Sequence, residues 1–112
     1  MERVHPIIED SYQQLKELCE EHEVERLYAF GSVLRPDFDI GSSDLDLIVN
    51  LKEMAPVDKG LMLLSLWDRL EGLFQRKVDL VTEGSLENPY FRAEIESTKQ
   101  LIYDRGRQEI SI

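Results

Sequence analysis

The residues best suited to chemistry are two aspartates, Asp44 and Asp46, which open an apolar segment that continues to Val49. Side chains alternate between the two faces of a strand, so both carboxylates point to one face and the intervening apolar side chains to the core. Two carboxylates on one face repel each other unless a cation lies between them. Because divalent cations such as Mg²⁺ prefer oxygen ligands, the spacing predicts a metal site.

A third carboxylate, Asp79, lies between Val78 and Leu80 in a later apolar segment. If that segment is a neighbouring strand, Asp79 points away from the core, toward the face of the other two aspartates. Paired residues on neighbouring strands bring their Cβ atoms to roughly 5 Å. We therefore expect three carboxylates to converge. Two Mg²⁺ ions there, or Mn²⁺ in their place, stabilise the attacking and leaving oxygens of an in-line displacement.

A Gly-Ser pair, Gly31-Ser32, ends the preceding predicted strand. Glycine lets the backbone turn sharply and approach a ligand closely. If a short helix begins at Ser32, its free N–H groups and the serine hydroxyl favour a phosphate group. Arg35 and Ser43, in the polar connection that follows, are further candidates for phosphate contact, although Arg35 pairs equally well with acidic neighbours in that loop.

The positions of apolar residues predict the order α-β-β-α-β-α-β, which is an α/β (α+β) fold with a small mixed sheet and helices packed on it. Residues 33–43 are expected to form a polar connection and residues 105–112 a fraying tail. The expected elements are helix 7–22, strand 25–30, strand 44–50, helix 56–74, strand 76–82, helix 88–97 and strand 100–103.

Length and composition fit one domain over residues 1–112, with a core over about 24–104 and an N-terminal helix within 1–23. No run of about 18 apolar residues exists and no signal peptide is evident, so we expect no membrane segment. Cys19 is the one cysteine, which excludes an internal disulfide and favours a cytoplasmic location.

The formal charge of −10, from 13 basic and 23 acidic residues, disfavours extended binding to nucleic acid. It suits a basic protein partner, whose approach it would speed, or it simply keeps the protein in solution.

The motif resembles the signature of the nucleotidyltransferase superfamily related to DNA polymerase beta. The likeness rests on Gly31-Ser32, an eleven-residue spacer and Asp44-Leu45-Asp46-Leu47-Ile48-Val49. Val78-Asp79-Leu80-Val81 is similar to that family's third-carboxylate strand, and residues 88–104 to its last helix and strand. The likeness is strongest to the minimal nucleotidyltransferases of bacteria and archaea. The spacer is one residue longer than the usual motif, which leaves the place of Arg35 open.

This resemblance implies a polymerase beta palm-like fold and nucleotidyl transfer from a nucleoside triphosphate with two Mg²⁺ ions. Asp44 and Asp46 would bind the metal ions. Asp79 would help to bind the catalytic metal and assist deprotonation of the acceptor hydroxyl. Gly31 and Ser32 would hold the triphosphate.

Many minimal nucleotidyltransferases are paired with a HEPN-domain protein, which in toxin–antitoxin pairs is a toxin neutralised by addition of AMP to a tyrosine. The resemblance therefore implies a protein adenylyltransferase that uses ATP and acts as the antitoxin of a HEPN toxin. Two alternatives stay open: a binding module that neutralises its partner by occlusion, and a small-molecule nucleotidyltransferase of the antibiotic-modifying type. So small a chain favours a macromolecular acceptor or a partner subunit, in a homodimer or hetero-oligomer.

Helix 56–74 carries more apolar residues than one narrow stripe requires, which predicts a docking or dimer surface. We interpret Trp67 as core rather than as a base-stacking platform, and expect Tyr90 and Phe91 to pack. Cys19 is interpreted as a small core residue and His22 as a helix-end residue. The excess apolar residues are Leu61, Met62, Leu63, Leu64 and Leu66.

Overall fold

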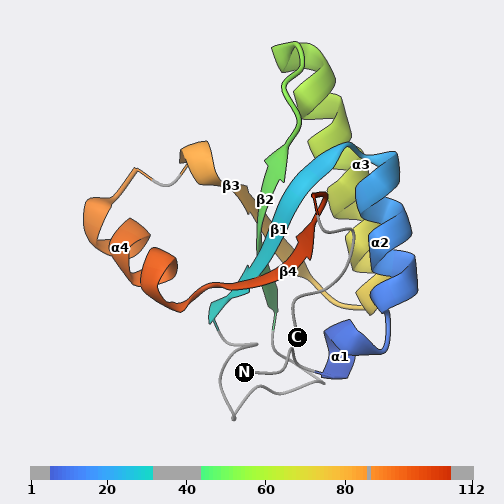
Figure 1. Cartoon of the computed structure of the whole chain (residues 1–112), viewed down its shortest axis with the longest axis horizontal. Helices are drawn as coiled ribbons and strands as arrows, with labels where there is room; N and C mark the ends of the chain where they lie inside the picture. The colour runs from blue at the N-terminus through green and yellow to red at the C-terminus, as the bar shows by residue number, and fades with distance from the viewer. Residues whose placement is uncertain (1–5, 32–43, 86, 107–112) are drawn as a thin grey trace.

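The structure is a computed structural model that describes residues 6–31, 44–85 and 87–106. It is a four-stranded sheet with α2 and α3 on one side and α4 on the other (Figure 1). Its elements are α1 (Pro6–Glu9), α2 (Tyr12–Glu21), β1 (Val24–Phe30), β2 (Leu45–Leu51), α3 (Pro56–Phe74), β3 (Val78–Thr82), the 3₁₀ turn η2 (Glu83–Ser85), α4 (Pro89–Thr98) and β4 (Gln100–Asp104).

The sheet is mixed, as the sequence predicts, with the strand order β3-β2-β1-β4. Strand β1 runs antiparallel to β2 and to β4, whereas β2 and β3 are parallel. Parallel strands need a crossover connection, and α3 supplies it. The candidate carboxylates Asp46 on β2 and Asp79 on β3 therefore lie on neighbouring strands, near the same end of the sheet.

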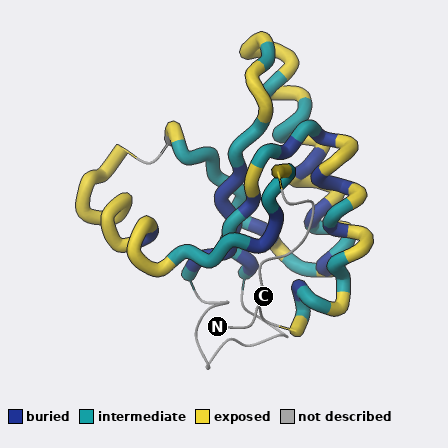
Figure 2. The backbone as a smooth tube through the Cα atoms, in the orientation of Figure 1, coloured by how far each residue is buried: buried dark blue, intermediate teal, exposed yellow. Residues whose placement is uncertain are grey.

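Side chains of β2 alternate as the sequence predicts. Leu45, Leu47 and Val49 are buried in the main core with residues from α1, α2 and α3. Ile48 faces the other way, into a small second cluster with Phe30 and Ile95. In Figure 2 the buried segments lie mostly in the central strands and in parts of the helices packed on them. Among the described residues, the face toward Ile48 carries only the small second cluster and is the thinly covered one. Asp46, two positions before Ile48 on the same strand, belongs to that face.

The predicted helix 7–22 is wrong in one respect, because it is broken into α1 and α2. At the break the Ser11 N–H donates to the Ile8 carbonyl, 3.2 Å away, and Ser11 leaves the helical conformation with φ −107° and ψ 15°. Asp10 and Ser11 belong to the residue types that favour helix ends over helix interiors. The break still leaves Ile8 and Leu15 both fully buried.

His22 ends α2 and links it to α3. Its Nδ1 lies 2.8 Å from the Leu18 carbonyl oxygen, which only accepts, so Nδ1 donates. Nε2 is hydrogen-bonded to the Ser65 hydroxyl, 2.9 Å away. The ring is buried on the α2–α3 side, away from the carboxylates, and its role is structural.

Cys19 lies fully buried in the main core, as interpreted from the sequence. Burial, with a smaller contribution from Glu20, raises the pKa of its thiol. An unreactive structural cysteine is the result. None of the described helices has the length and apolar character to span a membrane.

Candidate active site

The two carboxylates that the fold brings together are Asp46 and Asp79. They are register partners across the parallel strands β2 and β3. Both line a cleft of about 1070 Å³ on the thinly covered face of the sheet. Adjacent strands lie roughly 4.8 Å apart, a separation that a cation or a phosphate oxygen can bridge. This adjacency follows from the period-two pattern and the parallel pairing.

Gly31 forms the rim of this cleft, directly after β1. Its backbone has φ +70°, a left-handed conformation that glycine adopts readily. A Cβ atom at this position would lie 2.5 Å from Oδ2 of Asp46. The Asp46 carboxylate therefore packs directly on the Gly31 backbone. The other predicted phosphate contacts, Ser32, Arg35 and Ser43, lie outside the described residues.

Asp44 stands apart from the other two carboxylates. It precedes β2, and Lys77 Nζ lies 4.0 Å from its half-exposed carboxylate. It is not among the residues that line the cleft. Within residues 6–31, 44–85 and 87–106, no group of three or more His, Cys, Asp and Glu side chains lies close enough to hold a metal ion. The structure thus brings together Asp46 and Asp79 but not all three aspartates.

The candidate ligands nevertheless suit a hard divalent cation. All three are carboxylates, the oxygen donors that Mg²⁺ prefers. The Asp44–Lys77 pair is exposed and long, and pairs of that kind contribute at most about 1 kcal/mol. This ion pair alone is therefore a weak restraint on the Asp44 side chain.

The cleft has two walls that sequence reasoning did not assign. Trp67 of α3 is 39% exposed and Phe91 of α4 is 48% exposed, and both line the cleft. The expectation that Trp67 is core and that Tyr90 and Phe91 pack is therefore wrong. Helical periodicity identifies an apolar face but cannot show that the sheet ends beside it. Glu94 also lines the cleft, and as one acidic residue on an exposed helix it gave no signal.

Helix α4, the outer wall, is attached mainly at its C-terminal end. Ile95 is its buried residue, and its N-terminal half projects away from the sheet (Figure 2). Asn88 caps the free end, because its Oδ1 accepts from the N–H groups of Tyr90 and Phe91. The wall is thus an internally well-formed helix held over the sheet at one end.

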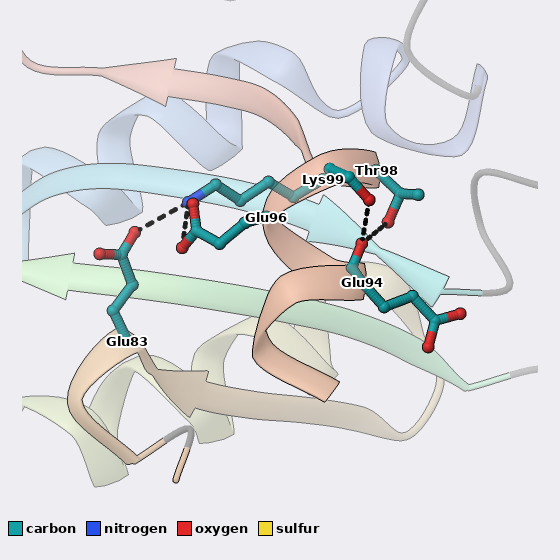
Figure 3. A network of polar contacts seen from close by, with 6 residues as sticks. Glu83, Glu94, Glu96, Thr98 and Lys99 are labelled. Carbon is teal, nitrogen blue, oxygen red and sulfur yellow. Dashed lines mark hydrogen bonds and ion pairs between the residues drawn. The ribbon is translucent and has the colours of Figure 1, made fainter. Parts of the chain in front are cut away.

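Lys99 supplies the polar part of that attachment. Its Nζ lies 3.2 Å from carboxylate oxygens of Glu83 and of Glu96, as Figure 3 shows, and 4.1 Å from the centroid of the Tyr28 ring. Burial lowers the pKa of Lys99, but the hydrogen bonds to Glu96 and Glu83 and the charge of Glu83 outweigh it and raise that pKa. Lys99 therefore ties α4 to η2 and β1.

Comparison with known proteins agrees with this architecture. The family model described as "Nucleotidyltransferase domain" matches residues 11–102. A protein of Methanocaldococcus jannaschii named "Putative protein adenylyltransferase MJ0126" is 38% identical over 88 residues, which cover 79% of this chain and 84% of that protein. A second protein of that organism, named "Putative protein adenylyltransferase MJ1217", is 36% identical over the same shares.

Solved structures show the same fold. The "Structure of putative minimal nucleotidyltransferase" has a TM-score of 0.62 and 31% identity, covering 82% of this chain and 89% of that one. A MNT antitoxin in complex with a tri-AMPylated HEPN toxin of Shewanella oneidensis has a TM-score of 0.58 and 15% identity, covering 88% and 74%. This second likeness is one of fold.

The family match spans most of the chain, and relatives more than 30% identical cover more than two thirds of it. With paired carboxylates beside a left-handed glycine, this chain belongs to the nucleotidyltransferase domain family and is an enzyme of that class.

Proposed function

We propose that this enzyme transfers AMP from ATP, with Mg²⁺, to a hydroxyl group of a partner protein, and that it is the antitoxin of a HEPN-domain toxin. The observation that carries the proposal is the register pairing of Asp46 with Asp79 in a cleft rimmed by Gly31. The names of the M. jannaschii relatives support protein adenylylation. Fold neighbours titled as a toxin–antitoxin pair with AMP-PNP and as a HEPN–MNT complex support the nucleotide and the partner.

The chemistry is an in-line displacement at the α-phosphorus of ATP. The acceptor oxygen forms a bond to that phosphorus, the bond to the bridging oxygen of the β-phosphate breaks, and pyrophosphate leaves. The proton of the acceptor hydroxyl passes to the Asp79 carboxylate and then to water. When bound, Mg²⁺ would supply positive charge that offsets the charge of the triphosphate and of the leaving oxygen. Asp44, Asp46 and Asp79 would hold it.

The phosphates would lie on the Gly31 side of the cleft. Gly31 has no side chain of its own to keep a ligand from its backbone, and the Asp46 carboxylate packs beside it. Ser32, with Arg35 and Ser43, would complete the phosphate contacts. The opposite wall is α4, and the cleft of about 1070 Å³ that it borders would receive the segment of the partner protein whose hydroxyl approaches Asp79.

The test is the intact mass of the product of the neighbouring gene, which we expect to be a HEPN-domain protein, after incubation with this protein, ATP and Mg²⁺. We expect a gain of one or more adenylyl groups with the wild type. The D44N/D46N double variant should lose transfer by at least about a hundredfold while remaining folded, because it removes two metal ligands. The control is D68N, which makes one Asp→Asn change at an exposed position on α3, outside the residues that line the cleft.

Three outcomes would overturn the proposal or part of it. Transfer that survives in D44N/D46N would contradict the roles of these carboxylates. A stable complex that inhibits the toxin without any mass change, with ATP, GTP, CTP or UTP, would favour neutralisation by occlusion. A mass gain with another nucleotide would retain the transferase but replace AMP.

A further inference from the structure

An exposed apolar stripe runs along α3. Val57, Leu61 and Leu64 are 74%, 62% and 63% exposed, and Trp67 continues the series. Spacings of four, three and three residues place them on one side of the helix. The buried residues of α3, Leu66 and others toward its C-terminal end, form a separate stripe. The exposed stripe is therefore additional to what the core uses.

This stripe borders a groove of about 530 Å³, which we name the α3 groove. Its other side is formed by Leu80 and Thr82 of β3, the edge strand. The lining is almost wholly apolar, and exposed apolar surface of this kind is typical of sites that bind other proteins. The residues that define it are Pro56, Val57, Gly60, Leu61, Leu63, Leu64, Trp67, Leu80 and Thr82.

The α3 groove is continuous with the active-site cleft, because Trp67 and Leu80 line both. Leu80 directly follows Asp79 on β3. Trp67 is fixed at this junction, since its Nε1 donates to the Val78 carbonyl oxygen over 2.6 Å. A protein bound in the α3 groove would therefore extend past the Trp67 side chain to the cleft that contains Asp46 and Asp79.

The charge of the chain indicates which occupant fits. Two copies that each carry a formal charge of −10 repel each other, whereas a protein of net positive charge is attracted. We propose that the α3 groove is the docking site of the acceptor protein, a protein of net positive charge, which places its hydroxyl over Trp67 toward Asp79. This inference rests on the proposed function, because it assigns a surface to the acceptor of that reaction.

The test uses the L61K/L64K variant. Both positions are exposed and lysine is a good helix former, so the fold should be kept. The matched control is Q13K/Q14K, which adds the same charge at two exposed positions on α2. For each protein we would measure the Kd of the HEPN-domain protein by calorimetry, KM and kcat for that protein, and the affinity for a non-hydrolysable ATP analogue with Mg²⁺.

We expect L61K/L64K to raise the Kd and KM for the acceptor protein by about tenfold or more, as loss of central interface contacts does. Saturating kcat and nucleotide affinity should match those of the wild type. Q13K/Q14K should stay within about threefold of the wild type, because only long-range charge changes.

Acceptor binding that stays within twofold in L61K/L64K overturns the docking site. A wild type that sediments as a dimer, with L61K/L64K monomeric, also overturns it and assigns the groove to a second copy. If the wild type binds the HEPN-domain protein without transferring AMP, the proposed function fails, but the Kd ratio still decides the docking site. If the wild type binds no such protein, both are overturned.

Discussion

Gly31 and Asp46 fit each other too closely for either to change independently. The carboxylate occupies the space in which a side chain at position 31 would begin. The left-handed backbone at Gly31 also disfavours any other residue type. This pair is therefore the most sharply defined part of the active site among the described residues.

Changing Gly31→Ala should lower the free energy of unfolding by about 1–3 kcal/mol, from backbone strain and from the clash with Asp46. Transfer activity should fall further than stability explains, because the Asp46 carboxylate, which we propose as a metal ligand, must move. Urea unfolding and the rate of partner adenylylation measure the two effects. Adenylylation at the wild-type rate would show that the Asp46 carboxylate does not need its position.

The control is Gly72→Ala, for which we expect the free energy of unfolding to rise rather than fall. Gly72 lies inside α3, and a Cβ there meets nothing within 4 Å. Alanine exceeds glycine in helix propensity, so this variant should gain about 0.5–1 kcal/mol. A loss of stability in both variants would mean that the clash at Gly31 is not the specific cause.

At the residue scale, the sequence predicts on which face of the sheet Asp46 and Asp79 lie. Side chains alternate between the two faces of any strand, irrespective of the strands beside it. The position of the Asp44 side chain could not be predicted, because Asp44 precedes β2 and the period-two alternation of a strand does not fix a residue outside it. The exposure of Trp67 could not be predicted either. It depends on β3 being the edge of the sheet, which is a property of the assembled fold.

At the element scale, α4 is held by the interactions of Lys99. This side chain is only 12% exposed and its ammonium contacts two carboxylates and an aromatic face. Lys99→Met keeps the length of the side chain and removes the charge. We expect it to lower the free energy of unfolding by about 1–2 kcal/mol and to speed amide hydrogen exchange in α4. Both can be measured on the purified variant.

The stabilisation that Lys99 provides should depend on pH, and the raised pKa fixes the direction of that dependence. The pKa of Lys99 is raised in the folded protein, so its contribution is fully present below the unfolded value of about 10.4 and is lost as the pH rises through the folded value. The stability difference between wild type and Lys99→Met should therefore narrow in alkaline solution. Lys52→Met, at an exposed pair with Glu23, should cost at most about 0.5 kcal/mol. Equal losses in the two variants would contradict the role of Lys99.

Strand β3 is an edge strand whose outer backbone groups are partly covered by α3. The Val78 N–H donates to Glu71 Oε2 over 2.9 Å, and the Val78 carbonyl accepts from Trp67. Covering an edge in this way limits pairing with other chains. Glu71→Ala should therefore cost about 1–2 kcal/mol and leave kcat unchanged, as measured by urea unfolding and adenylylation. Asp68→Ala, one turn away and exposed, is the control; a similar loss there would remove the special role of Glu71.

The ends of most elements could be predicted to within about two residues. The periodic pattern of apolar residues extends over most of each element, and several ends are marked by proline or glycine. Pro56 and Pro89 begin α3 and α4 as expected. The break between α1 and α2 was missed because the apolar spacing continues across it. The loose attachment of α4 was missed because an amphipathic pattern shows which side faces the protein but not how much of the helix makes contact.

At the scale of the whole molecule, the two faces of the sheet do different work. The face toward α1, α2 and α3 carries the main core, whereas the opposite face carries, among the described residues, only the small cluster of Phe30 and Ile48 with Ile95 of α4, together with the cleft. The carboxylates thus lie on a sheet whose other face is well packed, and they are themselves left accessible.

The net charge of −10 acts at longer range than the groove contacts. It should attract a basic acceptor protein before any contact in the groove forms.

Salt should therefore affect association and dissociation differently. Between about 0.01 M and 1 M ionic strength the Debye length falls from roughly 30 Å to 3 Å. We expect the association rate constant of the acceptor protein to fall by at least about tenfold over this range, while the dissociation rate changes little, because apolar contacts in the α3 groove are not screened. Trp67, the one tryptophan of the chain, lies at the groove and is the natural fluorescence signal for stopped-flow measurement.

The L61K/L64K variant separates the two contributions. It should shorten the lifetime of the complex while keeping most of the salt dependence of association, because the net charge changes only from −10 to −8 on adding two lysines. If salt instead accelerates dissociation and leaves association unchanged, the attraction is a local ion pair at the interface. The acidic surface would then have no role in guiding the partner.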